Sequence, residues 1–161
     1  VVADLGAGEG TLAQLLAQRA KQVIAVDHSK KMVQFGKKLA REHGLKNLEY
    51  RHGDIENPPI EDKSVDLAFL SQALHHANDP GVAIRAAHRI LKKGGRLVIL
   101  DLLQHSFDKA RDLYADTHLG FAEVEIAELL EEAGFKQIET AIVDREESPP
   151  HFQTLLAVAA K

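Results

Sequence analysis

Short apolar runs alternate with segments of helical periodicity along this chain, and this alternation constrains the fold more than any other feature of the sequence. Runs rich in Val, Ile, Leu and Ala predict buried strands, whereas apolar residues spaced three or four apart predict helices with one buried face. Glycine, proline and N-capping residues mark most of the boundaries. The predicted strands are residues 1–5, 23–26, 48–52, 65–70, 96–102, 138–143 and 154–159, and the predicted helices are residues 11–20, 29–44, 79–91 and 124–133, with Gly94 and Gly134 as caps of the last two.

Alternating strands and helices are typical of an α/β fold, a parallel sheet with helices on both faces. The last two strands depart from this pattern, because the polar, proline-containing connection at residues 144–150 contains no helix and strands joined in this way pair antiparallel. The sequence therefore predicts one domain over residues 1–161, with a mainly parallel seven-stranded sheet and a C-terminal antiparallel hairpin. Because Val1 already belongs to the first predicted strand, we expect the complete protein to have residues before it.

Charge and cysteine content narrow the class of partner. The chain has 20 basic and 24 acidic residues and a formal charge of -4, so it lacks the basic excess of a nucleic-acid-binding segment, and we expect none to bind here. It has no cysteine, which excludes disulfides, thiolate metal sites and a cysteine nucleophile and suits the reducing cytoplasm. No apolar run approaches the roughly 20 residues that cross a bilayer, so no membrane partner is expected.

A glycine-rich segment, D-L-G-A-G-E-G-T at residues 4–11, joins the first predicted strand to the first predicted helix. Gly6 permits a tight turn, Gly8 lets the backbone approach a ligand closely, and Gly10 lets the helix start against the strand. The free N–H groups at the start of that helix suit a carboxylate or another anion. The spacing is G-x-G-x-G, with Thr11 at the place where dinucleotide-binding folds carry their third glycine.

Two carboxylates follow the next two predicted strands. Asp27 ends the second strand, where a carboxylate can accept hydrogen bonds from both hydroxyls of a ribose. Asp54, within G-D-I after the third strand, is placed to accept from the amino group of an adenine. Either carboxylate alone is equally well explained as the cap of a turn or a helix, but together with the glycines they predict a site for an adenosine-containing cofactor.

These motifs resemble those of the class I S-adenosylmethionine-dependent methyltransferases. The resemblance extends through D-L-A-F-L-S-Q-A-L-H-H at residues 66–76 and L-K-K-G-G-R-L-V-I-L-D at residues 91–101, and it points to the small-molecule, UbiE-like branch. D-L-L-Q-H-S-F from Asp101, then Arg111, H-L-G-F and A-G-F, are similar to methyltransferase domains fused behind ArsR-type winged-helix repressors. The family implies a Rossmann-like fold, S-adenosyl-L-methionine as the cofactor and S-adenosyl-L-homocysteine as its product.

The resemblance also implies roles for positions of this chain. The glycines would approach the methionine moiety and the ribose, Asp4 would stabilise the loop or reach the methionine ammonium group, and Asp27 would hold the ribose. Asp54 and Ile55 would frame the adenine, while residues at the end of the fourth strand would lie beside the cofactor. The cofactor-binding residues implied in this way are Asp4, Gly6, Ala7, Gly8, Gly10, Asp27, His28, Asp54, Ile55, Ser71 and Gln72.

Methyl transfer from a sulfonium is an in-line displacement, so the protein mainly positions the two reactants and excludes water. A general base is required only for an acceptor that arrives protonated, as a phenol or thiol does. His75, His76 and His105 are the candidate catalytic residues, because both of their segments follow strands at the cofactor edge. The alternative is that the paired histidines pack beneath the cofactor and shape its loop.

The acceptor is a small molecule on this interpretation. Arg111, Tyr114 and His118 lie between the fifth strand and the next helix, where this fold places acceptor contacts, and Arg111 would hold an anionic acceptor or form a surface ion pair. The absence of cysteine excludes cytosine-C5 methylation and arsenite methylation through thiols. Residues 71–74 read S-Q-A-L in place of the Asn/Asp-Pro-Pro-aromatic loop of enzymes that methylate amino groups of DNA.

No metal site is predicted. The chain has nine histidines, but none shows H-x-x-x-H spacing or a cluster with carboxylates. Five of them are expected at exposed ends of helices or strands: His28, His43, His52, His88 and His151.

Two other functions fit parts of the sequence. A nicotinamide-dependent oxidoreductase shares a similar sheet, but the G-x-G-x-G spacing, the terminal hairpin and the short length count against it. The alternative to an enzyme is a non-catalytic domain that senses S-adenosylmethionine for a transcriptional regulator, with a DNA-binding module before Val1.

Overall fold

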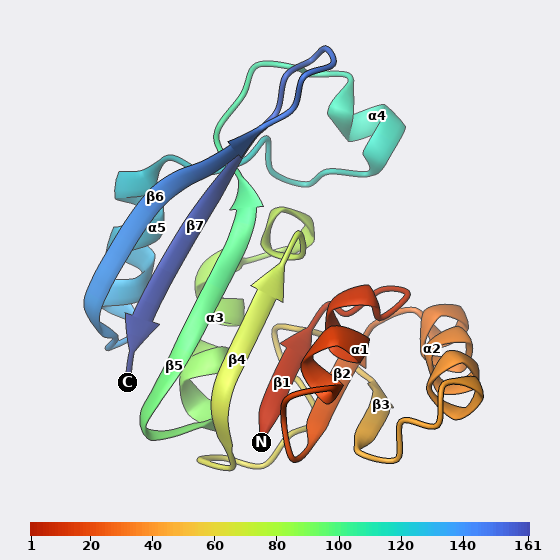
Figure 1. The fold of residues 1–161 in the computed structure, drawn as a ribbon. Coiled ribbons are helices and arrows are strands. Elements are labelled where there is room, and N and C mark those ends of the chain that lie inside the picture. The colour runs from red at the N-terminus through yellow and green to blue at the C-terminus, as the bar shows by residue number, and fades with distance from the viewer.

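The computed structural model describes residues 1–161 and contains one seven-stranded sheet. Its strands are β1 (Val2–Leu5), β2 (Val23–Asp27), β3 (Leu48–His52), β4 (Val65–Ser71), β5 (Leu91–Leu102), β6 (Lys136–Arg145) and β7 (Gln153–Ala160), in the spatial order β3-β2-β1-β4-β5-β7-β6. The first five strands are parallel, while β7 pairs antiparallel with both β5 and β6 (Figure 1). The predicted mainly parallel sheet with a C-terminal antiparallel hairpin is confirmed.

The helices are α1 (Thr11–Ala17), α2 (Lys30–Glu42), α3 (Pro80–Ile90), α4 (Ala110–Tyr114) and α5 (Glu123–Glu132), with a short 3-10 helix η1 at Leu74–His76. Two of the longer helices begin at polar caps. The side chains of Ser29 and Asp79 accept hydrogen bonds from backbone N–H groups in the first turns of α2 and α3. None of the helices combines the length and the hydropathy that a membrane-spanning helix needs.

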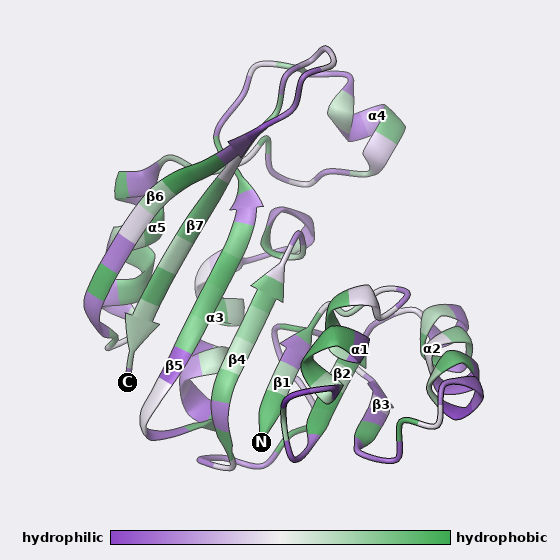
Figure 2. Ribbon diagram, in the orientation of Figure 1, coloured by the Kyte–Doolittle hydropathy of each residue, from purple (hydrophilic) through white to green (hydrophobic).

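Two hydrophobic clusters show how the helices cover the sheet. α1 and α2 pack on one face through a cluster that includes Val23 of β2 and Tyr50 of β3. Ile24 and Val26 of β2 point to the opposite face and belong to a cluster of 25 buried residues, which also holds the apolar sides of α3 and α5. In Figure 1, α3 and α5 lie behind β4–β7. Figure 2 shows apolar central strands and a hydrophilic tip of the β6–β7 hairpin.

The junction between α3 and β5 differs from the sequence prediction. The predicted helix runs to residue 91 with Gly94 as its cap, but Leu91 already has an extended backbone and pairs with Val65 of β4. Gly94, at a φ of 79°, lies inside β5. The ammonium group of Lys161 donates to the carbonyls of His88 and Leu91 at 2.6 and 2.7 Å, so this side chain satisfies the end of α3 in place of a glycine cap.

Candidate active site

The parallel strands place several loops at one edge of the sheet. The chain winds outward from β1 in one direction and from β4 in the other, and ligands of open α/β sheets bind at such a switch point. A cavity of about 290 Å³ lies there and is called the first cavity. It is lined by residues that follow or end β1, β2, β3 and β4: Gly6, Asp27, His28, Asp54, Ile55, Glu56, Gln72, Ala73, His76, Ala77 and Asn78.

Gly6 allows the loops after β1 and β4 to meet at the first cavity. Its φ is 81°, and the N–H groups of Gly6 and Ala7 both donate to the carbonyl of Val26, at 2.8 and 2.9 Å. A Cβ atom on Gly6 would lie 2.5 Å from the Cβ of Ala73. Any side chain at position 6 would therefore strain the turn and push the two loops apart.

The other residues of the glycine segment contribute from outside the cavity lining. The N–H of Gly8 donates to Oδ2 of Asp27 at 2.8 Å, and a Cβ on Gly8 would meet nothing within 4 Å. A Cβ on Gly10 would overlap the hydroxyl of Tyr50. The sequence explains Gly10 by the packing of a helix on its strand, whereas the structure shows that it makes room for a tyrosine of β3.

Asp27 joins two segments at the wall of the first cavity. Its Oδ2 accepts from Gly8 and its Oδ1 accepts from the N–H of Ser29, both at 2.8 Å. The residue is only 6% exposed, yet it lines the cavity. Each carboxylate oxygen keeps a further lone pair, so two hydroxyl groups of a ligand can donate to Asp27 without displacing the backbone contacts.

Asp54 lies in the loop after β3, together with a carboxylate that the sequence analysis missed. Oδ1 of Asp54 accepts from the N–H of Glu56 at 2.8 Å. Oε1 of Glu56 accepts from the N–H groups of Asn78 and Asp79, at 2.7 and 3.1 Å, which links this loop to the start of α3. The position of Glu56, two residues after Asp54, is the only sequence signal that could have found it.

Asp4 is buried beneath the glycine segment and does not line the first cavity. Burial and the negative charge of Asp27 raise the pKa of Asp4 to about 7, although a hydrogen bond from the backbone N–H of Ala13 acts in the opposite direction. Burial and the charge of Asp4 also raise the pKa of Tyr50 to about 12. Oδ2 of Asp4 and Oη of Tyr50 are both buried without a hydrogen-bond partner. This position suits the first role implied for Asp4, support of the loop.

Of the remaining residues implied for the cofactor, some line the first cavity and others do not. Gln72 and His28 both line the first cavity, and the His28 side chain is 83% exposed. Gln72 has a φ of 52° and its N–H donates to the carbonyl of Leu100 at 2.7 Å, so the chain turns sharply after β4. Ser71 pairs with Leu100 inside the sheet and does not line the cavity.

A second cavity, of about 330 Å³, shares His76 with the first. It lies between η1, the region of α4 and the tip of the β6–β7 hairpin. Its lining residues are His75, His76, Leu102, Tyr114, Asp116, Glu146, Pro149, Pro150 and Phe152.

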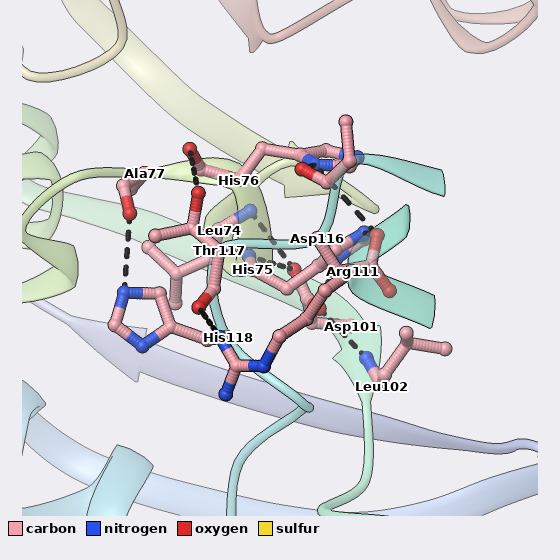
Figure 3. Close-up of polar contacts among 11 residues, drawn as sticks. Leu74, His75, His76, Ala77, Asp101, Leu102, Arg111, Asp116, Thr117 and His118 are labelled. Atoms are coloured by element: carbon pink, nitrogen blue, oxygen red, sulfur yellow. Dashed lines mark hydrogen bonds and ion pairs between the residues drawn. The ribbon is translucent and has the colours of Figure 1, made fainter. Parts of the chain in front are cut away.

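Of the three residues expected to contact an acceptor, only Tyr114 lines the second cavity. Nη1 of Arg111 donates to the carbonyl of Thr117 at 2.9 Å, and Arg111 forms no ion pair. Nε2 of His118 lies 3.1 Å from the carbonyl of Ala77 (Figure 3). These two contacts connect the loop after α4 to its neighbours, and the other side-chain nitrogens of Arg111 and His118 have no partner in the protein.

His75 is buried at the centre of a cluster with two carboxylates (Figure 3). Its Nδ1 lies 2.7 Å from Oδ1 of Asp101, and its Nε2 lies 3.4 Å from Oδ1 of Asp116. The N–H groups of Leu74, His75 and Leu102 donate to Asp101 and fix it. Burial lowers the pKa of His75, but the hydrogen bond to Asp101 and the charges of both carboxylates outweigh it, so the net pKa is raised.

This cluster corrects the expectation that the histidines lie apart from carboxylates. Asp101 comes from the end of β5 and Asp116 from the loop after α4, so sequence spacing does not reveal their meeting with His75. Asp101 is the second-last residue of β5, at the carboxyl edge of the parallel strands, and that signal could have found it. Nothing in the sequence marks Asp116.

The two other candidate bases differ in position. His76 lines both cavities, and its Nδ1 lies 3.2 Å from the carbonyl of Ala115. His105 lines neither cavity: its Nδ1 accepts from the N–H of Phe107, and its ring lies 4.6 Å from that of Phe152 between centroids. Burial lowers the pKa of His105, which the charge of Asp116 opposes. His76 is thus the candidate in contact with both spaces.

Comparisons with known proteins agree with this geometry. The family model described as a methyltransferase domain matches residues 3–99, more than half of the chain. The chain is 35% identical over 100 residues to the uncharacterized methyltransferase YcgJ of Bacillus subtilis, covering 62% of this chain and 40% of that protein. It is 36% identical over 100 residues to the ubiquinone/menaquinone biosynthesis C-methyltransferase UbiE of Rubrivivax gelatinosus, covering 62% of this chain and 38% of that protein. The matched region thus spans about two fifths of these relatives.

Solved structures share the fold. The crystal structure of YcgJ from Bacillus subtilis superposes with a TM-score of 0.82 at 20% identity, covering 99% of this chain and 91% of that one. The [4+2]-cyclase SpnF superposes with a TM-score of 0.80 at 21% identity, covering 99% and 74%. The fold alone therefore does not fix the reaction. The family match over residues 3–99, placed on this fold and this cavity, shows that the chain belongs to the methyltransferase domain family.

Proposed function

We propose that this domain transfers a methyl group from S-adenosyl-L-methionine to a small-molecule acceptor and releases S-adenosyl-L-homocysteine. One observation carries the proposal: Gly6, Asp27 and Asp54 come from the ends of three different strands, and all line the first cavity. Backbone that can approach a ligand, with one carboxylate at each of two further strand ends, suits the three parts of an adenosine-containing amino acid. Family membership supports the same cofactor.

In this proposal, each residue of the first cavity has a separate task. Asp27 accepts from the ribose hydroxyls through its remaining lone pairs, and the free oxygen of Asp54 accepts from the adenine amino group. The turn at Gly6 admits the methionine moiety next to the backbone. The cofactor itself supplies a methyl group on a positively charged sulfur, so the protein needs to bind, orient and exclude water.

The second cavity is the proposed place of the acceptor. It meets the first cavity at His76, and the aromatic rings of Tyr114 and Phe152 line it. A space of about 330 Å³ suits a small molecule. The relative UbiE is named as a C-methyltransferase of ubiquinone/menaquinone biosynthesis, which supports a small acceptor here as well.

Calorimetric titration with S-adenosyl-L-homocysteine tests the cofactor site. We expect one site in the wild type and roughly 10- to 100-fold weaker binding in Asp27→Asn, because the loss of charge-assisted hydrogen bonds costs about 1.5–3 kcal/mol. Asp144→Asn, on the exposed face of β6, is the matched control and should bind like the wild type. Equal affinity of Asp27→Asn, or binding of NAD alone, would contradict the proposal. Binding without methyl transfer to a broad metabolite panel would favour a sensor.

A further inference from the structure

Asp116 is a buried carboxylate that the proposed cofactor site does not use. Its side chain is 2% exposed, and its Oδ1 is buried without a hydrogen-bond partner. A buried ionised carboxylate is unfavourable unless positive charge or hydrogen bonds compensate it. Nε2 of His75 at 3.4 Å and Nδ1 of His76 at 3.8 Å both lie beyond the usual hydrogen-bond distance. Oδ1 of Asp116 thus faces two imidazole nitrogens without a hydrogen bond to either, and it can still accept a ligand.

The spacing of these groups fits three ligands around one metal ion. One nitrogen or oxygen atom from each of His75, His76 and Asp116 lies within 4.8 Å of the other two. Ligand atoms bound about 2.0–2.2 Å from an ion are about 3–3.6 Å apart in octahedral or tetrahedral geometry. The two imidazole nitrogens lie 3.4 and 3.8 Å from Oδ1 of Asp116, close to that spacing, and the widest pair of ligand atoms, at up to 4.8 Å, would draw together around an ion.

Asp101 provides the outer contact that a metal-binding histidine normally has. Oδ1 of Asp101 lies 2.7 Å from Nδ1 of His75 and hydrogen-bonds to it. This leaves Nε2 of His75, the atom nearer Asp116, free to bind an ion. Asp101 is fully buried, and the N–H groups of Leu74 and Leu102 hold its two oxygens. The imidazole of His75 is therefore oriented before any ion arrives.

We propose that His75, His76 and Asp116 bind one divalent transition-metal ion, such as Zn²⁺, at the wall of the second cavity. Two imidazoles and one carboxylate suit Zn²⁺ and other first-row metals. The protein offers only three ligands, so at least one coordination position of the ion remains open. This position faces the second cavity, because all three residues line that cavity. The rest of this inference depends on the proposed function. The ion would bind a hydroxyl or carboxylate oxygen of the methyl acceptor, so the acceptor is a small molecule that carries such an oxygen. This proposal departs from the sequence expectation that no metal binds.

Titration of Zn²⁺ into the tag-free, chelator-treated protein by calorimetry tests the site. We expect one site of micromolar or higher affinity, weakened at least about 100-fold in both Asp116→Asn and His76→Gln. His43→Gln replaces an exposed histidine of the α2 terminus and should keep the wild-type affinity. Co²⁺ should give the visible absorption of a protein-bound ion in the wild type and not in Asp116→Asn.

The contrary results are equally clear. Equal Zn²⁺ affinity of the wild type and Asp116→Asn would show binding to exposed histidines only and would overturn the proposal, as would no binding at all. S-adenosyl-L-homocysteine is titrated into the same samples of wild type and Asp116→Asn, because Asp116 does not line the first cavity. Retained binding of this ligand with no Zn²⁺ site rejects the metal proposal alone. Binding of Zn²⁺ with no binding of S-adenosyl-L-homocysteine rejects the proposed function but supports the metal site.

Discussion

At the scale of single residues, Tyr50 explains two glycines that lie far apart in the sequence. Its ring is almost fully buried, and a Cβ atom on either Gly10 or Gly36 would overlap it. Gly10 is the N-cap of α1 and Gly36 lies in the middle of α2, so the tyrosine of β3 fills the space between these helices. Because the ring is enclosed on both sides, it cannot move aside for a new side chain.

Gly10→Ala should therefore destabilise the protein more than an ordinary turn glycine does. We expect its free energy of unfolding to fall by about 3 kcal/mol, of which about 1 kcal/mol is the strain of a φ of 88° and the rest is overlap with Tyr50. Gly44→Ala is the control, because Gly44 has a φ of 67° but nothing within 4 Å of its Cβ position, and should lose only about 1 kcal/mol. Urea denaturation measures both. Equal losses of unfolding free energy in the two variants would show that the Tyr50 ring moves aside to accept the new side chain.

The sequence predicts the cofactor side of the site better than the acceptor side, and the reason is local. Gly6 follows β1, Asp27 ends β2 and Asp54 lies two residues after β3, so the edge rule for parallel sheets is enough to bring them together. Asp116 follows the five-residue helix α4, which has no clear periodicity in the sequence. Its neighbour His75 lies in a 3-10 helix. Their meeting depends on how long loops fold back.

At the scale of elements, an aromatic cluster connects α4 to the β6–β7 hairpin. The ring of Phe152 lies 4.6 Å from that of His105, 6.1 Å from Phe107 and 6.4 Å from Tyr114, between centroids. α4 has only five residues and just one buried side chain, Ala110. A helix of this length is only marginally stable by itself, and its position over the second cavity therefore depends on these aromatic contacts.

Phe152→Ala should release α4 without disturbing the first cavity. Loss of aromatic contacts worth about 1.4 kcal/mol or more predicts roughly tenfold faster hydrogen exchange of amides in residues 107–114. Binding of S-adenosyl-L-homocysteine should stay within about twofold of the wild type, since Phe152 does not line the first cavity. Phe35→Ala, at a partly exposed position of α2, is the matched control and should leave this exchange unchanged. Unchanged exchange in Phe152→Ala would mean that other contacts hold α4.

Element boundaries show a second limit of sequence prediction. The strands, the longer helices and the terminal hairpin follow from apolar runs and turn residues, because these signals are short in range. The end of α3 depends instead on Lys161, which lies at the far end of the chain and bonds to the carbonyl of Leu91. Gly94 resembles a helix cap in the sequence, but the pairing of Leu91 with Val65 extends β5 past it.

At the scale of the whole molecule, Asp4 links stability to pH. It lies on β1, a central strand of the sheet flanked by β2 and β4, so only global unfolding exposes it to water. Its pKa is raised to about 7 in the folded protein from an ordinary value of 3.8. Between these two values the folded state holds the proton and the unfolded state does not. The contribution of Asp4 to stability is therefore full below pH 3.8 and is lost as pH rises toward 7.

Asp4→Asn should remove this dependence. The free energy of unfolding of the wild type should fall, relative to that of the variant, by about 2–3 kcal/mol between pH 5 and pH 8, at about 1.4 kcal/mol for each pH unit up to 7. The raised pKa of His75 also lowers stability as pH increases, but it is common to both proteins and cancels in the difference. Urea denaturation across this range measures the effect, with the exposed Asp144→Asn as a control whose difference from the wild type should stay flat. A flat difference for Asp4→Asn would mean that Asp4 is ionised in the folded protein throughout, and that water or a cation reaches the glycine segment from below.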